Sequence, residues 1–563
     1  MTNNRCEKGE VTGDPKDSKT RDKIKKINDS TNKPFNMYEY RQKLQNKQYD
    51  YEKLLDNEET VIGIPRVLYF WEGMPFWSTF WKSLGFTVKV SPISTRAIYE
   101  NGIHAVPSDT ECFPAKLVHG HIRELAKMNV DRIFMPIIVV MPSENTEETS
   151  FSRCALVKGY PIVIGNSDNP VRNFNIKFDS PYFYWYSDED REKQLCEYMN
   201  KEYGIDKEIC RKAVGFASAA QKEYEKQLKA KGQEIINEVT KNNKFAVVMA
   251  GRPYHNDPLV NHELPEMLVN MGVPVLTADS LPDLSKTDLR KSRIDIVNNF
   301  HARMLGSSIL AAQNDNLEYI QIVSFGCGHD AVLSDEIVRL MKEISGKAPL
   351  ILKVDESDAQ GPLRIRVRSF IETIERKRAK NIRHEIKPLP DPYPVKYLKK
   401  DRKEKVVLVP NSSHAFCQIM TAAFRSQGVR AVPLDVGREE AIRLGKKYTH
   451  NDICFPAQIV IGEILGALKS GEYNTDEVAV GMAKYLGCCR LPHYATILRK
   501  ALDDAGYQNI AIMTNDDVDL HQLHPGFKIN MMTLINVTMA LPMIDVLEEI
   551  LRKKRPYEKI KGS

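Results

Sequence analysis

The chain has 563 residues and a formal net charge of +6 at pH 7, and 42% of its residues are hydrophobic. That length suits about three or four domains of ordinary size. Basic and acidic residues are interspersed, so the mild charge gives no argument for nucleic-acid binding. No apolar run approaches the ~20 residues that cross a bilayer, and the polar start lacks a signal-peptide core. We therefore expect a cytoplasmic protein without a membrane segment.

The first part of the chain changes character near residue 58. Residues 1–57 are rich in Lys, Asp, Asn and Glu and hold too few apolar positions to build a core, which predicts a disordered tail with a helix near 37–55. Apolar segments then alternate with helical ones over 58–186, which predicts a first α/β unit with a parallel sheet covered by helices on both faces. We predict its strands at 62–70, 86–90 and 130–140 and a helix at 75–84.

The rest of the chain continues this alternation. Residues 187–244 are charged and predict a helical connector, and 245–375 predict a second α/β unit. Its expected helix spans about 258–271, and a basic helix begins near 364. Residues 376–403 carry four prolines and predict a linker. Residues 404–563 follow the plan of the first unit and add a helical tail.

A twelve-residue stretch around Cys112 recurs around Cys454, with the shared pattern C-F-P-A-x-[LI]-V-x-G-x-I. Such a repeat indicates duplicated units. Proline is favoured in the first turn of a helix, so each cysteine should lie where a helix begins. A helix N-terminus favours thiolate, the form that binds metals. The alternative is a small buried residue at a loop–helix junction.

Other cysteines also lie after predicted strands. Cys154 follows the third strand of the first unit, and Cys327 lies between two glycines at the end of a strand. The segment holding Cys488 and Cys489 corresponds in the third unit to the place of Cys154. Ligands of parallel sheets bind at the carboxyl ends of strands, so Cys112 and Cys154 could reach one rim. Cys196 and Cys210, in the charged helical segment, are interpreted as buried thiols.

Several chemistries fit cysteines on separate loops. A [4Fe–4S] cluster needs thiolates gathered from distant loops, and three of them leave one iron free for a non-protein ligand. Zinc competes, although no C-x-x-C pair is present and no histidine stands at zinc-finger spacing from a cysteine. A nucleophilic cysteine with a histidine base is a third option. Separately, the turn at Arg252 could serve a phosphate or could be a simple strand-to-helix turn.

Four stretches together resemble a known family: the two C-F-P-A segments, S-F-G-C-G-H-D-A around Cys327, and K-V-D-E with R-I-R-V-R over 353–368. They are similar to the iron–sulfur, non-ATPase portion of the large 2-hydroxyacyl-CoA dehydratase activator-related proteins. That portion is in turn similar to 2-hydroxyacyl-CoA dehydratase and benzoyl-CoA reductase subunits. The resemblance extends from about residue 60 to the C-terminus and implies several flavodoxin-like α/β units.

The resemblance also implies a cofactor and a partner. In the dehydratases an ATP-driven activator passes one low-potential electron to a [4Fe–4S] cluster, and water then leaves a 2-hydroxyacyl-CoA through a ketyl radical. Carried over by position, Cys112, Cys154 and Cys327 would hold a first cluster. Cys454 with Cys488 or Cys489, and with Cys417 as a further candidate, would form a second site. We expect the chain to match a middle portion of the larger proteins, so that a partner supplies ligands missing from the second site.

The resemblance therefore implies an iron–sulfur redox protein that works with a separate ATP-dependent activator. The chain shows no Gly-rich phosphate-loop signature, so ATP hydrolysis is assigned to that partner. An acyl-CoA substrate and a homo- or hetero-oligomeric state are further expectations. A non-catalytic scaffold or regulatory subunit, and a zinc-binding α/β protein, are the alternatives.

Overall fold

A computed structural model describes most of the chain, namely residues 33–109, 111–142, 152–357, 360–382, 384–411, 413–435, 437, 439–482, 489–514, 524–527, 530–560 and 562. The chain forms two compact units. Unit 1 contains Met1–Leu289, Asn298–Gly326 and Ile337–Pro388, and unit 2 contains Arg290–Val297, Cys327–Glu336 and Leu389–Ser563.

Three four-stranded sheets share one topology, which confirms the predicted α/β class with parallel sheets. All their strand pairs are parallel, and in each sheet the order is second, first, third, fourth strand. The first sheet contains β1 (Val61–Ile64), β2 (Thr87–Val90), β3 (Arg132–Phe134) and β5 (Lys177–Asp179); the second contains β7 (Ala246–Ala250), β8 (Val275–Thr277), β9 (Leu317–Ser324) and β10 (Leu350–Val354); the third contains β11 (Val406–Val409), β12 (Arg430–Pro433), β13 (Val478–Gly481) and β14 (Ala511–Met513).

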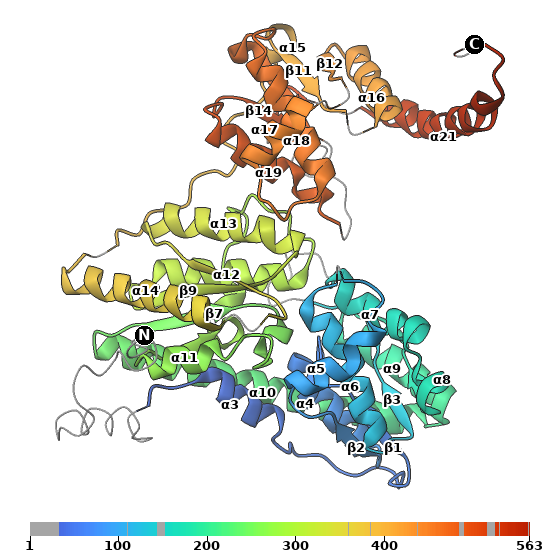
Figure 1. Ribbon diagram of the computed structural model, residues 1–563, viewed down its shortest axis with the longest axis vertical. Coiled ribbons are helices and arrows are strands. Elements are labelled where there is room, and N and C mark those ends of the chain that lie inside the picture. Colours follow the sequence, from blue (N-terminus) through green and yellow to red (C-terminus); the bar gives the residue numbers. More distant parts are fainter. Residues whose placement is uncertain are drawn as a thin grey trace, which may run out of the picture. The chain divides into compact units, whose positions relative to one another are not determined.

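Helices connect and flank these strands (Figure 1). Unit 1 holds α3 (Met37–Gln45), α4 (Phe70–Ser83), α5 (Arg96–Gly102), α6 (Phe113–Lys127), α7 (Ala155–Ser167), α8 (Pro170–Phe174), α9 (Asp188–Tyr203), α10 (Lys207–Lys241), α11 (Leu264–Asn270), α12 (Asn299–Gln313) and α14 (Gln360–Ala379). Unit 2 holds α15 (Asp401–Glu404), α16 (His414–Ser426), α17 (Glu439–Tyr448), α18 (Phe455–Lys469), α19 (Tyr494–Asp504) and α21 (Met531–Lys554), and α13 (Gly328–Ser345) is divided between the units.

The single strand predicted over 130–140 was wrong. The structure breaks it into β3 and β4 (Ile137–Val140), and β4 pairs with β6 (Tyr182–Tyr184) in a separate two-stranded sheet. The break falls at Pro136, which has no N–H to donate to a ladder. The segment that precedes Cys154 therefore belongs to the two-stranded sheet and not to the first four-stranded sheet.

The composition of residues 1–57 predicted a disordered tail with one helix. Residues 35–45 instead pack against the rest of unit 1. The predicted helix near 37–55 is shorter, and Met37 is fully buried. The Phe35 carbonyl accepts a hydrogen bond from the Val275 N–H, and the Tyr38 hydroxyl donates to the Met249 carbonyl at 2.9 Å. A buried ion pair joins Arg41 to Asp279. These contacts attach α3 to the edge of the second sheet. Residues 1–32 lie outside the described residues.

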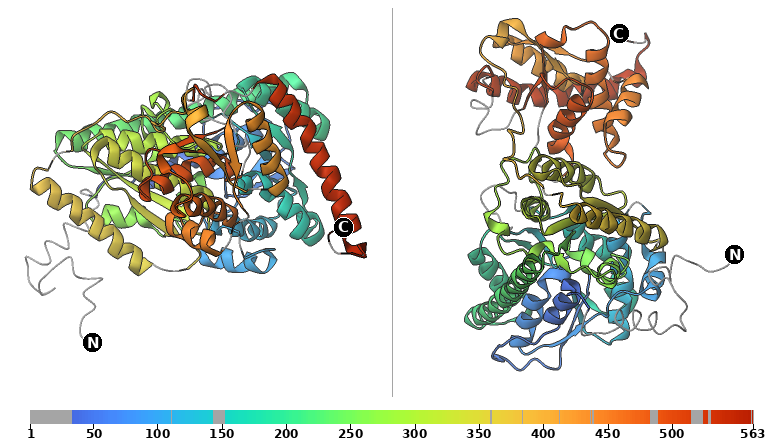
Figure 2. Two further views of the ribbon diagram at one scale, coloured as in Figure 1. Left: turned by 90° about the horizontal axis from the view of Figure 1, so that it is seen from above. Right: turned by 90° about the vertical axis from the view of Figure 1, so that its left-hand side faces the viewer.

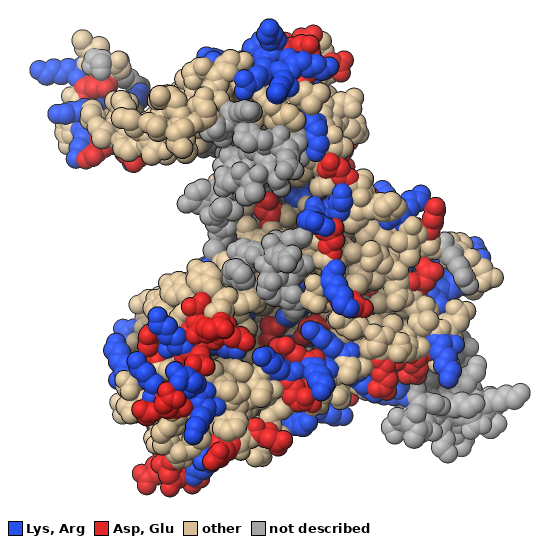
Figure 3. All heavy atoms as spheres, turned by 180° about the vertical axis from the view of Figure 1, so that it is seen from behind, with Lys and Arg blue, Asp and Glu red and all other residues tan. Residues whose placement is uncertain are grey.

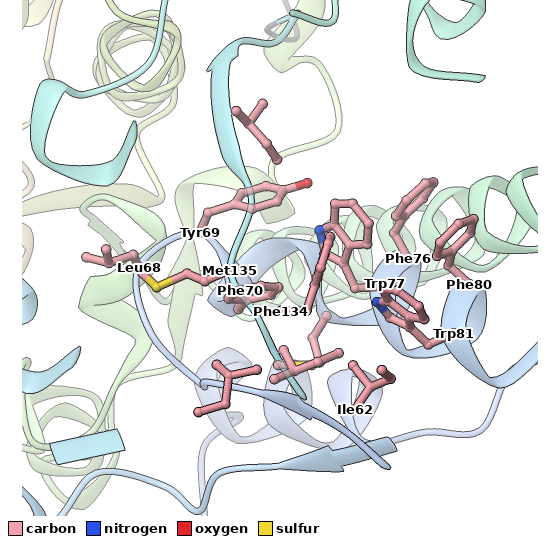
Figure 4. Close-up of a cluster of buried hydrophobic side chains, with 14 of the residues drawn as sticks. Ile62, Leu68, Tyr69, Phe70, Phe76, Trp77, Phe80, Trp81, Phe134 and Met135 are labelled. Carbon is pink, nitrogen blue, oxygen red and sulfur yellow. The ribbon is translucent and has the colours of Figure 1, made fainter. Parts of the chain in front are cut away.

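The core of the first sheet is built from aromatic side chains (Figure 4). Trp77 and Trp81 of α4 are fully buried, and their rings lie 4.8 and 5.1 Å from the ring of Phe134 on β3. Such large rings bury much apolar area and prefer the tilted and edge-to-face arrangements seen here. The rigid packing fixes α4 on the sheet that carries the Cys112 loop.

Glycine allows two helix pairs to approach closely. A Cβ added to Gly120 of α6 would lie 2.1 Å from the Ile98 carbonyl oxygen of α5. In unit 2 a Cβ on Gly462 of α18 would lie 1.7 Å from the Ala441 carbonyl oxygen of α17. These glycines occupy the same place in the repeated pattern. The repeat therefore encodes a helix–helix contact as well as the position of a cysteine.

Helix α21 extends away from the sheet of unit 2, with its first turn beside α16 (Figure 2). The Gln427 side chain of α16 donates to the Thr533 hydroxyl. Met531, Met539 and Met543 are each more than 60% exposed. Figure 3 shows basic and acidic side chains interspersed over the face it presents. Among the described helices none is both long and apolar enough to cross a membrane.

Candidate functional site

Cysteines occupy equivalent places in the three sheets. Between the third strand of each sheet and the helix that follows lies Cys154, Cys327 or Cys488, respectively. Cys488 is outside the described residues. Cys112 and Cys454 precede the helices that lead into the third strands, α6 and α18. Cys112 and Cys454 therefore share one structural position, and Cys154 and Cys327 share one place in the order of strands and helices.

Cys112 and Cys454 are the N-cap residues of α6 and α18, as predicted. Their backbone angles are nearly the same, φ −67° and ψ 149° against φ −62° and ψ 146°. Proline follows in the first turn of both helices. Neither thiol caps its helix by a hydrogen bond. Both are half-buried, and neither is in a disulfide. The helix N–H dipoles at each site favour negative charge on sulfur.

Cys154 is a third N-cap residue, at the start of α7. Its sulfur accepts a hydrogen bond from Arg252 Nη1 at 3.4 Å, and the Arg252 side chain is 1% exposed. Arg252 lies directly after β7, so the thiol faces the carboxyl end of the second sheet. The sequence pointed to this arginine only as a candidate for phosphate. In the structure its guanidinium can offset charge on a thiolate.

A buried hydrogen-bond network connects the two helices that begin at Cys112 and Cys154. The Tyr160 hydroxyl of α7 donates to the Glu111 carboxylate and lies 3.0 Å from His119 Nε2 of α6. His119 Nδ1 is 2.8 Å from Asp168, and Arg123 donates to the same carboxylate through both terminal nitrogens. Burial, then the hydrogen bond to Glu111, raise the pKa of the Tyr160 hydroxyl.

Sequence reasoning did not find this network. The sequence contains one hint of the network. Glu111 and His119 lie eight residues apart, about two helical turns, so they can share one side of the helix that starts between them. Asp168 and His119 are almost completely buried, and burial opposes ionisation of Asp168, but the hydrogen bonds from His119 and Arg123 lower its pKa. The satisfied network holds α6 against α7, and with them the two cysteines.

A second buried network joins the first sheet to the second. His121 lies between Ser91, 2.8 Å from Nδ1, and Ser94, 2.9 Å from Nε2. Ser94 donates its proton to Asp257, so its oxygen accepts from Nε2–H. Ser91 accepts from the Arg66 N–H and keeps its own proton for Nδ1, an arrangement that suits a neutral imidazole. Burial and nearby Arg66 lower the pKa of His121 to about 3. Burial raises the pKa of Asp257 to about 6.

These buried groups predict loss of stability in acid. His255, beside Arg252, also has its pKa lowered to about 3 by burial. Both histidines bind protons more readily in the unfolded chain, so their stabilising effect is lost as pH falls from ~6.5 towards 3. Asp257 binds its proton more readily in the folded state, so its effect on stability has the opposite sign. Between pH ~4 and 6 it offsets the loss from about one of the two histidines. The urea midpoint should therefore be lower at pH 5 than at pH 7.

Tryptophan fluorescence reports unit 1 in this measurement because Trp71, Trp77, Trp81 and Trp185 all belong to it. The His121→Asn variant removes one titrating group and should reduce the difference between the two pH values. An unchanged difference in that variant would contradict the assignment of a neutral buried imidazole.

Cys327 follows a sharp turn at the end of β9. Gly326 has φ +74°, a conformation that favours glycine, and a Cβ there would meet no neighbouring atom. The preceding Phe325 N–H donates to the Val354 carbonyl at 2.9 Å, which anchors the turn to β10. The Cys327 carbonyl accepts from the Ala331 N–H, so the residue starts the first turn of α13. Like Cys112, it is half-buried and not in a disulfide.

Unit 2 holds a second pair of thiols. Cys454 Sγ lies 3.2 Å from the Tyr494 hydroxyl. Burial, then the contact with Cys454, raise the pKa of Tyr494. Cys489 is exposed, and its sulfur accepts from the Leu491 N–H at 3.3 Å.

The remaining described cysteines are structural. Cys417 donates to the Val409 and Pro410 carbonyls at 3.5 and 3.4 Å, and burial raises its pKa to about 11. A neutral thiol with carbonyl partners is a poor metal ligand. Cys196 and Cys210 lie against one another in the packing of α9 on α10, in agreement with their interpretation as buried thiols.

The candidate donor set consists of thiols at separate helix N-termini. Among the described residues no three His, Cys, Asp or Glu side chains gather as a mononuclear metal site requires. An iron–sulfur cluster instead takes one thiolate at each of several irons, so its ligands stand apart. Cys112 and Cys154, at two helix N-termini and with Arg252 beside one sulfur, fit that chemistry.

The comparison with known families concerns the part of the chain that carries these two residues. Residues 61–281 match the CoA enzyme activase uncharacterised domain, DUF2229. The matched segment contains Cys112, Cys154 and Arg252 and ends before Cys327. No protein of curated function matches the chain. Over residues 61–281, the chain is thus similar to proteins that carry a CoA enzyme activase domain.

Proposed function

We propose that the protein binds an iron–sulfur cluster and serves as a redox component related to the 2-hydroxyacyl-CoA dehydratases. The observation that carries this proposal is the pairing of Cys112 and Cys154 in one compact unit. Each is the N-cap residue of a helix, and one buried network joins the two helices. The match of residues 61–281 to a CoA enzyme activase domain supports the relation to the acyl-CoA dehydratase system.

In unit 1 the proposed ligands of the first site are Cys112 and Cys154, and the family resemblance adds Cys327 as the third. Three thiolates leave one iron of a [4Fe–4S] cluster open to a non-protein ligand, and the cluster supplies one-electron chemistry when bound. In this account Arg252 offsets negative charge at the Cys154 sulfur, and the Tyr160 network fixes the distance between two of the ligands. Cys454 with Cys488 or Cys489 would form the second site.

The proposed electron donor is a separate ATP-dependent activator, and the proposed substrate is an acyl-CoA. Glu111 and Cys112 are only half-buried. This exposure supports the proposal that an electron donor or a substrate reaches the Cys112 thiol from solvent. Lys116, one turn further along α6, forms an ion pair with Glu356 after β10 at 2.8 Å. That pair holds the start of α6 to the carboxyl end of the second sheet.

Electron acceptance is the test of this function. The protein, reconstituted anaerobically with iron and sulfide, is mixed with the activator and ATP, and its visible absorption and electron paramagnetic resonance are followed. We expect ATP-dependent bleaching and a new paramagnetic signal, and neither without ATP. A cluster that a chemical reductant reduces but the activator does not would assign the protein to the scaffold or regulatory class. Bound zinc in place of iron would refute the proposal.

A further inference from the structure

A cavity of about 640 Å³ opens at the amino end of the second sheet, the edge opposite the one that Arg252 follows. Its lining comes from the loops that precede β9 and β10, from the start of these strands and from α14. All of these residues belong to unit 1, so the cavity lies within one compact unit. A volume of this size suits a small organic ligand. The proposed iron–sulfur function does not involve this cavity.

A buried carboxylate forms part of the cavity wall. Glu318, the second residue of β9, is 7% exposed. The ammonium nitrogen of Lys347 lies 4.0 Å from its carboxylate, beyond hydrogen-bonding distance. Lys347 donates instead to the backbone carbonyls of Ala311, Asn314 and Leu317 at 3.1, 2.7 and 2.7 Å. An ammonium has three protons, so none is left for Glu318. No group in the described part of the chain donates to this carboxylate, which therefore presents unused acceptors to the cavity.

The surroundings of Glu318 favour a positively charged group. Helices α10 and α13 end at Lys241 and Ser345, two residues before the cavity-lining Asn243 and Lys347. Helix C-termini carry partial negative charge and attract cations. Burial raises the pKa of Glu318, because an ionised carboxylate is costly away from water. An ammonium group beside the carboxylate would offset that cost.

One face of α14 supplies positive charge and apolar surface to the same cavity. Arg366, Phe370 and Lys377 are spaced by four and seven residues, which places them on one side of a helix. Phe370 is half-buried, and Ile365 beside it is 65% exposed. Arg366 donates through one terminal nitrogen to the Ile351 carbonyl at 2.7 Å. Lys377 forms no ion pair with any carboxylate that the structure describes. This face can therefore hold an anionic group next to an apolar one.

We propose that this cavity binds a small zwitterion with an apolar body, the chemistry of an apolar amino acid. The ligand ammonium donates to Glu318, the ligand carboxylate accepts from Lys377, and the apolar body packs on Phe370. Hydrogen bonds between ionised groups are about twice as strong as neutral ones, and an apolar body releases water from the α14 face. An aromatic ring suits the contact with Phe370, so L-phenylalanine is the first probe.

The test is isothermal titration calorimetry of the full-length chain with L-phenylalanine, for which we expect saturable binding. Glu318→Gln keeps the shape of the side chain and removes its charge, so it should raise the dissociation constant about tenfold or more. Lys377→Glu should raise it about fivefold or more. Lys380→Glu is the matched control: it makes the same change of charge near the end of α14 but lies outside the cavity wall. Its dissociation constant should equal that of the wild type.

Two analogues test the two charges of the ligand. N-acetyl-phenylalanine lacks the ammonium and phenethylamine lacks the carboxylate, so each should bind at least about tenfold more weakly than L-phenylalanine. Binding of either analogue as tight as that of L-phenylalanine would overturn the inference.

The variants and a second probe can also overturn it. Neither L-phenylalanine nor L-leucine giving saturable binding would do so, and so would an equal loss in Lys377→Glu and Lys380→Glu. None of these measurements depends on iron, so their failure leaves the proposed function standing.

Discussion

Replacing Cys154 with serine should remove most of the iron that the protein binds at its first site. A serine hydroxyl has the size of the thiol but does not ionise in the range where a thiolate forms, and iron–sulfur clusters are held by thiolates. Cys154 is buried at a helix N-terminus with Arg252 at 3.4 Å from its sulfur, so no neighbouring thiol replaces it without moving the backbone. Iron and acid-labile sulfide per chain are the measured quantities.

Cys417→Ser is the matched control for this prediction. Cys417 is also buried, but its thiol donates to backbone carbonyls, and a serine hydroxyl can make the same hydrogen bonds. Its iron content should equal that of the wild type. Full iron content in Cys154→Ser would refute the assignment of this ligand, and an equal loss in both variants would indicate general damage to folding.

The second large effect concerns the fold that supports the site. Gly120→Ala should lower the free energy of unfolding of unit 1 by about 1–3 kcal/mol, the usual cost of overpacking. The added Cβ would lie 2.1 Å from the Ile98 backbone oxygen, so α5 and α6 must separate. Because Cys112 caps α6, we expect the same variant to bind less iron. Urea unfolding followed by tryptophan fluorescence measures the change.

Gly215→Ala is the control. Gly215 lies within α10, and a Cβ there would meet no atom within 4 Å. Alanine is the better helix former, so this variant should raise the free energy of unfolding by about 0.5–1 kcal/mol. A Gly120→Ala protein as stable as Gly215→Ala would show that α5 and α6 do not depend on the close approach.

The sequence predicted correctly those helices and strands that depend on residues close together in the chain. The C-F-P-A segments predicted helices that begin after Cys112 and Cys454, because proline in a first turn is a strong local signal. The helix predicted over 75–84 ends before Gly85, which takes φ +85° ahead of β2. The alternation of apolar strands and helices predicted the parallel sheets for the same reason.

Long-range contacts were beyond the reach of local patterns. Pro136 within an apolar run did not reveal that the two halves of the run pair in different sheets. The contact of Arg252 with Cys154 joins residues 98 positions apart. Tyr160 carried no signal until the structure placed its hydroxyl beside Glu111 and His119. These contacts depend on how sheets pack, which spacing along the chain does not encode.

The content of iron and acid-labile sulfide in protein purified and reconstituted without oxygen tests the central claim most directly. The account predicts iron and sulfide in equal amounts, about four of each per cluster, with the characteristic broad visible absorption. The Cys112→Ser and Cys154→Ser variants should lose the first cluster. A colourless protein without iron after reconstitution, or one that binds zinc instead, would contradict the claim that these helix-capping thiols hold an iron–sulfur cluster.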